Sequence, residues 1–216
     1  MGTVAIIAAG DFPTAVKSCT MLTSCDVVIC CDGAVVPYLN YCGHFPDYVV
    51  GDMDSIPPSV KKAVYGNMGT HVVEMSDQET NDLTKSFGVA LELGPAGIHI
   101  FGATGKREDH TLANVSLLPG YVRIAADRGC SKVDMVSDFG IFIVCSDTCS
   151  VKCRANCEVS LFSFDVGLHI HAEGLMYPTD GVIFDELWKG SLNVAVSDHF
   201  ELIFNHPSAL IVYIAE

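Results

Sequence analysis

Short apolar runs alternate with stretches of helical periodicity over roughly the first 125 residues of the chain. The apolar runs are rich in β-branched residues, are bounded by Gly, Pro or Asp, and cover residues 4–9, 27–30, 48–50, 72–74 and 98–101. Such runs are typical of parallel strands that are buried on both faces of a sheet. Between them, apolar residues recur at helical spacing over 83–91 and 111–118. The alternation predicts an α/β domain with a doubly wound, mostly parallel sheet.

The pattern changes near residue 130. Strand-like runs with turn residues between them, and no convincing amphipathic helix, cover residues 141–144, 159–164, 168–171, 192–196 and 210–214. This pattern is typical of an all-β sandwich or barrel. We therefore predict an α/β domain over residues 1–130 and an all-β domain over residues 131–216.

Four loops that follow predicted strands carry aspartates, namely Asp32, Asp52, Asp54, Asp82 and Asp109. Any one of them has a plain structural explanation, because turns and helix N-caps favour Asp. Together they indicate a site, since the carboxyl ends of parallel strands form the ligand crevice of an open α/β sheet. Crowded carboxylates repel each other and have raised pKa values unless a cation neutralises them. Oxygen ligands without clustered His or Cys favour Mg²⁺ or Mn²⁺, and magnesium bound in this way can accept the phosphates of ATP.

Basic and glycine residues in the same loops could hold those phosphates. The turn between Gly102 and Gly105 allows close backbone approach before a predicted helix, and Arg107 lies in the same loop. The spacing differs from that of a P-loop, which disfavours a P-loop NTPase. Asp82 and Lys85 lie on one face of the preceding helix, where they form either a surface ion pair or a metal and phosphate site.

Charge and cysteine usage narrow the classes of partner. The net charge of −14 disfavours nucleic acid and anionic lipid. The apolar runs fall well short of the roughly 20 residues that a membrane span requires, and no basic region precedes the first one, so we expect a cytoplasmic protein. The ten cysteines are expected to be reduced. Cys145, Cys149, Cys153 and Cys157 recur at every fourth position, which favours one packed sheet face over a metal cluster.

The order and spacing of these motifs resemble the thiamine pyrophosphokinase family. The matching segments are Asp32-Gly33-Ala34, Gly51-Asp52-Met53-Asp54-Ser55-Ile56, Asp77-Gln78-Glu79-Thr80-Asn81-Asp82-Leu83-Thr84-Lys85, and Gly105-Lys106-Arg107-Glu108-Asp109-His110 with Asn114. Farther along, Gly174-Leu175-Met176-Tyr177-Pro178 is similar to the family's G-L-x-Y-P segment, and Ser197-Asp198-His199 falls at its Ser-Asn-Glu position. The resemblance implies an ATP-binding α/β domain, a C-terminal β-sandwich and a homodimer with thiamine bound between subunits.

The implied reaction transfers the diphosphate of ATP to the thiamine hydroxyl and releases AMP. We expect Asp52, Asp54 and Asp82 to hold Mg²⁺ and to serve the nucleophile, with Lys85 and Arg107 on the phosphates. The expected ATP-binding residues are Asp32, Gly33, Gln78, Thr80, Gly102, Gly105, Asp109, His110 and Asn114. The expected acceptor-binding residues are Trp188, Ser197 and Asp198, although a sole tryptophan in a β-sandwich more often belongs to the core.

Two positions depart from the family pattern. Asp198 stands where the family usually has Asn, which turns an amide into an acceptor that would still suit the aminopyrimidine or the cationic thiazolium of thiamine. Asn81 replaces the commoner Thr before Asp82, and both residues suit a helix N-cap. Three alternatives remain at this point: a related diphosphokinase with another alcohol acceptor, a non-catalytic thiamine or nucleotide sensor, and a structural calcium site.

Overall fold

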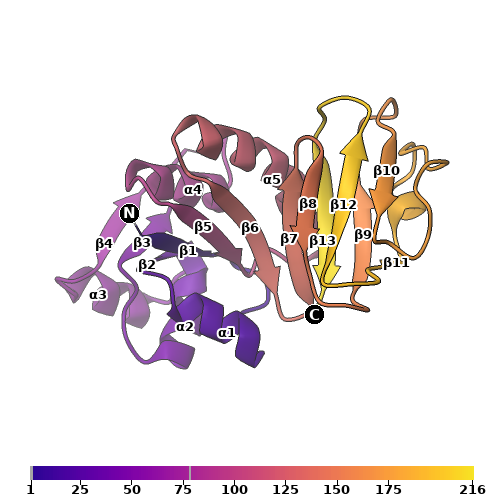
Figure 1. Cartoon of the computed structure of the whole chain (residues 1–216). Coiled ribbons are helices and arrows are strands. Elements are labelled where there is room, and N and C mark those ends of the chain that lie inside the picture. Colours follow the sequence, from indigo (N-terminus) through magenta and orange to yellow (C-terminus); the bar gives the residue numbers. More distant parts are fainter. Residues whose placement is uncertain (1, 78) are drawn as a thin grey trace. The chain divides into compact units, whose positions relative to one another are not determined.

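The apolar runs of the first half form parallel strands in the computed structural model, which describes residues 2–77 and 79–216 (Figure 1). The chain divides into two compact units, and the division falls between Asp138 and Phe139. The sequence had placed the boundary at residue 130. The difference is strand β6 (Lys132–Ser137), which pairs in parallel with the strand before it and therefore lies in the N-terminal unit.

Six parallel strands of the N-terminal unit lie in the order β6-β5-β1-β2-β3-β4. The first five in the sequence are β1 (Thr3–Ile7), β2 (Val27–Cys31), β3 (Tyr48–Gly51), β4 (His71–Glu74) and β5 (Gly97–Phe101). From β1 the chain builds outward to β4, then returns to place β5 on the other side of β1. This order puts a topological switch point between β1 and β5, and ligands bind at the carboxyl ends of strands beside such a point.

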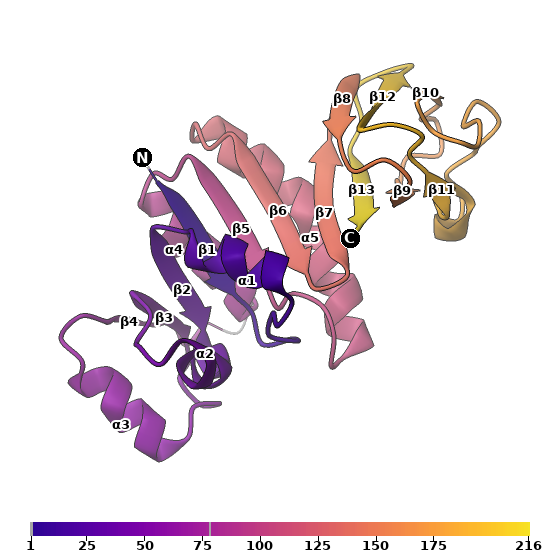
Figure 2. The same cartoon turned by 60° about the horizontal axis from the view of Figure 1, so that its bottom comes forward.

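Helices cover both faces of this sheet, which confirms the doubly wound prediction. They are α1 (Val16–Thr23), α2 (Val35–Cys42), α3 (Pro58–Gly66), α4 (Asp82–Glu92) and α5 (Glu108–Asp127). Helices α4 and α5 lie on one face and α1 and α2 on the other, as Figures 1 and 2 show from two directions. The predicted apolar stripe of α4 is buried, with Leu83 and Phe87 only 4% and 3% exposed.

The C-terminal unit consists of two antiparallel sheets that share one apolar core. One sheet has the order β11-β9-β13-β7 and the other β10-β12-β8. Their strands are β7 (Gly140–Cys145), β8 (Cys149–Lys152), β9 (Glu158–Phe162), β10 (Ile170–Glu173), β11 (Asn193–Val194), β12 (His199–Phe204) and β13 (Leu210–Ala215). Leu161 and Val212 from the first sheet and Leu202 from the second belong to the same core cluster. Two of these strands, β8 and β12, were not predicted from the sequence.

The four regularly spaced cysteines do not lie on one strand, so that prediction was wrong. Cys145 ends β7 and Cys149 begins β8, whereas Cys153 and Cys157 lie in the segment between β8 and β9. All four nevertheless pack in or against the core of the unit. The cysteines are therefore four residues apart because of the lengths of the two connections, β7 to β8 and β8 to β9, and not because they alternate along one strand.

A carboxylate from the end of the sheet binds the residues at the start of helix α1. Ala15 at the N-cap of α1 has no side-chain oxygen, and Asp138 accepts hydrogen bonds from Thr14 N at 2.8 Å and from Thr14 Oγ1 at 2.6 Å. Asp138 also accepts a hydrogen bond from the Ser18 hydroxyl. Burial opposes ionisation, but the hydrogen bonds from Ser18 and Thr14 outweigh it and lower the pKa of Asp138 to about 2.

Replacement of Asp138 by Ala should lower the free energy of unfolding at pH 7 by about 1.5–3 kcal/mol, because hydrogen bonds to a charged group contribute about that much. Because the pKa of Asp138 is lower in the folded chain than in the unfolded chain, its stabilisation is complete above about pH 4 and is lost as pH falls through about 2. Urea unfolding midpoints at pH 7 and pH 2.5 measure the difference, with Asp127→Ala in the last turn of α5 as the control. If Asp138→Ala lowers the urea midpoint by the same amount at both pH values, this assignment is wrong.

Candidate active site

A cavity of about 480 Å³ lies at the carboxyl ends of β1, β2 and β3 in the N-terminal unit. We call it the strand-end cavity. Five segments contribute to its lining: the loops after these three strands, the approach and first turn of α4, and the first two turns of α5. Its lining residues are Ala8, Ala9, Cys31, Asp32, Gly33, Asp52, Ser55, Thr80, Asn81, Asp82, Leu83, Lys85, His110, Ala113 and Asn114. The predicted loops after β2, β3 and β4 do converge here, whereas the predicted loop after β5, which the structure describes in full, contributes only His110 to the lining.

Three carboxylates come close enough to share a metal ion. Asp32, Asp52 and Asp54 each place one oxygen within 4.8 Å of the others. Asp32 is 3% exposed, and its Oδ2 accepts a hydrogen bond from Ser55 N at 3.1 Å. Its Oδ1 is buried and has no hydrogen-bond partner in the described part of the chain. A buried carboxylate oxygen without a donor requires an explanation, and a divalent cation supplies one, so these residues fit Mg²⁺.

Asp32 and Asp52 have pKa values that are shifted in opposite directions. Burial raises the pKa of Asp32, and the nearby Asp82 and Asp52 carboxylates raise it further, whereas hydrogen bonds from Ser55 partly oppose the shift. The backbone N–H of Asp54 lowers the pKa of Asp52. Ionisation of Asp32 is thus less favourable in the metal-free protein than in water, and a bound cation would stabilise the ionised form.

Gly51 makes the approach of the carboxylates possible. This residue ends β3 with φ +151°, and a Cβ there would lie 2.8 Å from the Cβ of Asp32 and 3.4 Å from Cγ of Asp82. Asp32 itself has φ +21° in the turn after β2. A larger residue at position 51 would push Asp32 away from its present position.

Helix α4 supplies a paired acid and base to the strand-end cavity. Asn81 caps the helix by accepting a hydrogen bond from Thr84 N at 2.8 Å. In the first turn, Lys85 Nζ lies 3.2 Å from Asp82 Oδ1, and Lys85 is only 8% exposed. The sequence grouped Asp82 with Asp52 and Asp54 as metal ligands, whereas the structure places Asp32 in that group and pairs Asp82 with Lys85. Asp82 still lines the same cavity.

The glycine turn after β5 is fixed against the loop after β1. Gly102 and Gly105 have φ values of +63° and +82°. Gly10 N donates to Gly102 O at 2.7 Å, and Lys106 Nζ donates to Ala9 O at 2.8 Å. The predicted phosphate-binding glycines are therefore ordered beside Ala8 and Ala9, but they do not themselves line the strand-end cavity.

The remaining predicted nucleotide residues fall into two groups. His110 and Asn114 line the cavity from α5, and Asn114 Nδ2 donates to Ala103 O at 2.8 Å, which joins this helix to the glycine turn. Arg107 and Asp109 form an exposed ion pair with Nη2 and Oδ2 2.6 Å apart, outside the cavity lining. Thr80 lines the cavity, and Gln78 lies outside the described residues.

Sequence reasoning missed several lining residues. Ser55, whose backbone N–H bonds Asp32, stood inside the quoted Gly51–Ser55 motif and could have been found there. Nothing in the sequence pointed to Cys31 or to the two alanines after β1 as lining residues. In the structure, Cys31 Sγ lies 3.1 Å from Ser86 Oγ.

The predicted acceptor residues lie in the C-terminal unit. Trp188, in the 3-10 helix η2 (Leu187–Gly190), is 68% exposed, and its Nε1 donates to Glu186 at 2.9 Å. It is therefore not a core residue. Asp198 is exposed beside Ser197, and its Oδ1 lies 2.9 Å from His199 Nδ1.

Comparisons with known proteins agree with these features. Residues 19–127 match the family model described as thiamin pyrophosphokinase, catalytic domain, and residues 140–213 match the one described as thiamin pyrophosphokinase, substrate-binding domain. Thiamine pyrophosphokinase 1 of Oryza sativa is 40% identical over 80 residues, which are 34% of this chain and 30% of that protein. Thiamine pyrophosphokinase of Bacillus subtilis is 36% identical over 76 residues, which are 35% of this chain and 36% of that protein. These matches thus span about a third of the length of the curated relatives.

Solved structures show the same fold along nearly the whole chain. Thiamine pyrophosphokinase from Bacillus subtilis aligns with a TM-score of 0.79 and 23% identity, covering 99% of this chain and 98% of that chain. Thiamin pyrophosphokinase from Candida albicans aligns with a TM-score of 0.79 and 18% identity, covering 99% of this chain and 89% of that chain.

In the described ranges, no helix combines the length and apolar character needed to cross a bilayer.

Replacement of Asp32 by Asn should weaken Mn²⁺ binding by about tenfold or more, because it removes a charged ligand. The same change should stabilise the metal-free protein above the pKa of Asp32, since burial makes the ionised carboxylate unfavourable there. Electron paramagnetic resonance titration with Mn²⁺ and thermal unfolding at pH 8 measure the two effects. Asp127→Asn, far along α5, is the matched control. Unchanged Mn²⁺ affinity in Asp32→Asn would remove this residue from the metal site.

Proposed function

The chain belongs to the thiamin pyrophosphokinase family, and on that premise we propose that it transfers the diphosphate of ATP to the hydroxyl of thiamine, giving thiamine diphosphate and AMP. The observation that best supports the proposal is the group of Asp32, Asp52 and Asp54 beside the buried Lys85 in the strand-end cavity. A cluster of acidic oxygens that fits Mg²⁺ next to a buried cation is suited to a polyphosphate substrate.

Magnesium would be held by Asp32, Asp52 and Asp54, with Asp82 beside them. When bound, the ion neutralises negative charge on the phosphates of ATP. The orphaned Oδ1 of Asp32 and the ionised Asp52 supply the oxygen ligands for it. Their separate loops, after β2 and β3, fix the ligands to the ends of buried strands rather than to one flexible segment.

The donor nucleotide would lie along the cavity between α4 and α5. Lys85 provides a buried positive charge for the phosphates, and Arg107 provides an exposed one that first has to leave Asp109. His110 and Asn114 line the same cavity from α5 and would contact the nucleoside. We place Gly33, Thr80 and the glycine turn with Gly102 and Gly105 near the phosphates, with Gln78 in the same loop as Thr80.

The transfer itself requires little covalent chemistry from the protein. The thiamine hydroxyl oxygen bonds to the β-phosphorus of ATP, the bond from that phosphorus to the oxygen shared with the α-phosphorus breaks, and AMP leaves with that oxygen. The hydroxyl proton passes to a carboxylate of the Asp52, Asp54 and Asp82 group, which acts as general base. Positioning of the two substrates would supply much of the rate, because a primary alcohol is a weak nucleophile.

The acceptor would be recognised by the C-terminal unit, with Trp188, Ser197 and Asp198 as contacts. The exposed indole of Trp188 can stack on an aromatic ring, and the carboxylate of Asp198 suits a cationic one. We further propose a homodimer in the cytoplasm. Exposed apolar side chains of the C-terminal unit support an interface there, including Met176, Ile183 and Leu192 at 52%, 49% and 74% exposure.

Purified protein incubated with ATP, Mg²⁺ and thiamine should form AMP and thiamine diphosphate in equal amounts. EDTA should abolish both products, because the acidic cavity would then repel the phosphates. Quantitative chromatography of both products is the measurement. AMP without thiamine diphosphate would indicate another acceptor, and thiamine binding without any product would favour a sensor.

Replacement of Asp54 by Asn should lower kcat by at least about 100-fold, since it removes a proposed ligand of the metal ion and a candidate general base. The thermal unfolding midpoint should stay close to that of the unchanged protein. The midpoint should hold because Asp54 is exposed. Steady-state kinetics and circular dichroism measure the two effects, with Asp127→Asn as the control for loss of one negative charge. Near-normal turnover of Asp54→Asn would refute its role.

A further inference from the structure

Two of the three carboxylates that fit a metal ion belong to one short segment, residues 51–56, which we call the metal loop. Asp52 and Asp54 are separated in it by Met53, which has φ +65° and is 1% exposed. A residue with a Cβ seldom adopts this left-handed conformation, because the Cβ then lies too close to a carbonyl oxygen. Contacts with the surrounding structure therefore have to stabilise the backbone at Met53.

Helix α3 supplies a donor to this part of the backbone. Lys61 Nζ donates a hydrogen bond to Met53 O at 3.1 Å. That oxygen belongs to the peptide group that joins Met53 to Asp54, and the N–H of the same group donates to Asp52 Oδ1 at 3.2 Å. Because a peptide group is planar, a contact at its oxygen also fixes the direction of its N–H. The bond from Lys61 therefore helps to orient the carboxylate of Asp52.

The position of Lys61 in its helix is explained by this contact. Lys61 is the fourth residue of α3, and a cation near a helix N-terminus is unfavourable because the helix dipole is positive there. Its acceptor lies outside the helix, in the metal loop. A hydrogen bond from a charged donor is stronger than one from a neutral donor, so this contact can offset the unfavourable position.

Tyr65, one turn farther along α3, helps to keep the ammonium group in place. Lys61 Nζ lies 5.9 Å from the centroid of the Tyr65 ring, a distance at which a cation is attracted to the ring face. The Tyr65 hydroxyl donates a hydrogen bond to Glu74 Oε1. Glu74 ends β4 and is paired in register with Gly51 of β3, where the metal loop begins. These contacts connect the start of α3 to both ends of the loop.

We propose that Lys61 is a positioning residue for the metal ion: it holds the peptide group after Met53 and thereby keeps both carboxylates of the metal loop beside Asp32. Lys61 acts through the loop, since it does not itself line the strand-end cavity. The proposal rests on the metal site of the proposed function, but it does not depend on which alcohol accepts the diphosphate.

The sign of the change in metal affinity separates positioning from charge. Lys61→Met removes the hydrogen bond and keeps an unbranched side chain of similar length. Loss of a positive charge near a cation site would by itself strengthen cation binding, whereas loss of the positioning contact weakens it. We expect the Kd for Mn²⁺ to rise about tenfold, a usual effect of removing a group that orients metal ligands. Electron paramagnetic resonance titration of the metal-free protein measures this Kd without turnover.

Lys62→Met is the matched control for charge, because Lys62 is the next residue of α3 and is exposed. It should leave the Kd for Mn²⁺ unchanged. Lys61→Arg should bind Mn²⁺ more tightly than Lys61→Met, since a guanidinium group keeps the charge and the N–H donors. If Lys61→Met does not fold, Lys61→Gln replaces it, because glutamine is uncharged, stays polar at this half-buried position and ends one atom shorter.

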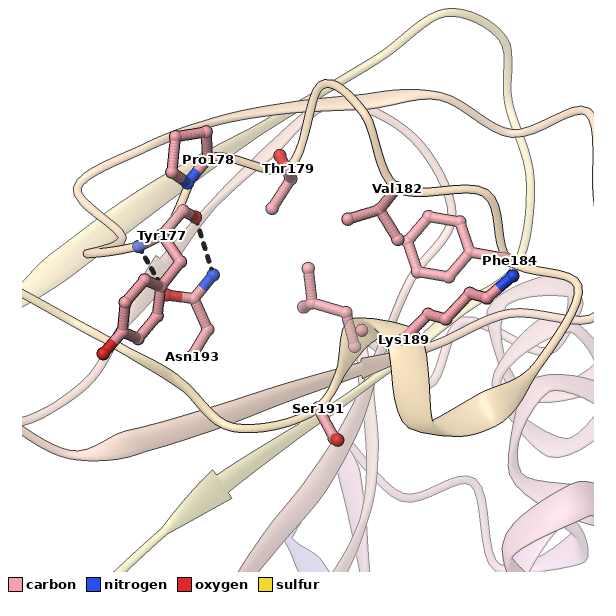
Figure 3. Close-up of a pocket in the computed structure, with 10 residues that line it drawn as sticks. Tyr177, Pro178, Thr179, Val182, Phe184, Lys189, Ser191 and Asn193 are labelled. Carbon is pink, nitrogen blue, oxygen red and sulfur yellow. Dashed lines mark hydrogen bonds between the residues drawn. The ribbon is translucent and has the colours of Figure 1, made fainter.

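A second control removes a backbone contact of the same kind from the C-terminal unit. Tyr177 N donates to Asn193 Oδ1 at 3.0 Å, and Asn193 Nδ2 donates to Tyr177 O at 2.8 Å, as the dashed lines in Figure 3 show. Asn193→Ala should lower the thermal unfolding midpoint, because it leaves backbone groups without these partners. It should not change the Kd for Mn²⁺, which separates loss of stability from loss of metal affinity.

A double-mutant cycle with Asp54→Asn tests whether Lys61 acts through the metal loop. Once a carboxylate of the loop is lost, the position of the loop matters less, so the two losses of Mn²⁺ affinity should be less than additive. Fully additive losses, or an unchanged or lower Kd in Lys61→Met, would overturn the proposal. Weaker Mn²⁺ binding by Lys61→Met in a protein that forms no thiamine diphosphate would instead support the positioning role and refute the proposed function.

Discussion

Repulsion between carboxylates at one edge of the parallel sheet is the constraint on which the rest of the N-terminal unit depends. Asp32, Asp52 and Asp54 lie together at strand ends, and Asp82 stands next to them. Such an arrangement is unfavourable in the absence of a cation, and burial, together with the neighbouring Asp82 and Asp52 carboxylates, raises the pKa of Asp32. The fold tolerates this cost because the rest of each strand is buried in an apolar sheet, and the cost becomes useful once a divalent ion binds.

The backbone brings the carboxylates together through a few unusual conformations. Gly51 leaves room where a Cβ would meet Asp32, and the turn after β2 holds Asp32 at a positive φ. Lys85 is the only basic residue that lines the described cavity, and it is held by Asp82. An anionic ligand would therefore bind at this acidic surface only with the help of a cation and of Lys85.

The sequence predicted the features that depend on local pattern, and it was less informative where tertiary contacts decide. Apolar runs and helical spacing were enough for the doubly wound sheet, and the rule that loops gather at strand ends was enough for the cavity. The sequence could not show which third carboxylate lies with Asp52 and Asp54. That choice depends on the space left at Gly51 and on the pairing of Asp82 with Lys85. Strand β8 was missed because only Val151 of its four residues is buried, so it has no apolar run. The cysteine spacing suggested a single strand where two connections exist.

Both units hold a side chain or a turn in place by the same physical means. In the N-terminal unit, Asp32 is fixed by the Ser55 backbone N–H, and in the C-terminal unit Tyr177 is fixed by the Asn193 amide. In each case a buried polar group is bonded to a turn, so that the exposed or reacting group does not have to be ordered when a substrate binds. Ordering of a loop and its side chains would otherwise reduce affinity, because each immobilised side chain costs about 0.5–1.5 kcal/mol. Preorganisation of this kind reduces the part of this cost that falls on the binding step.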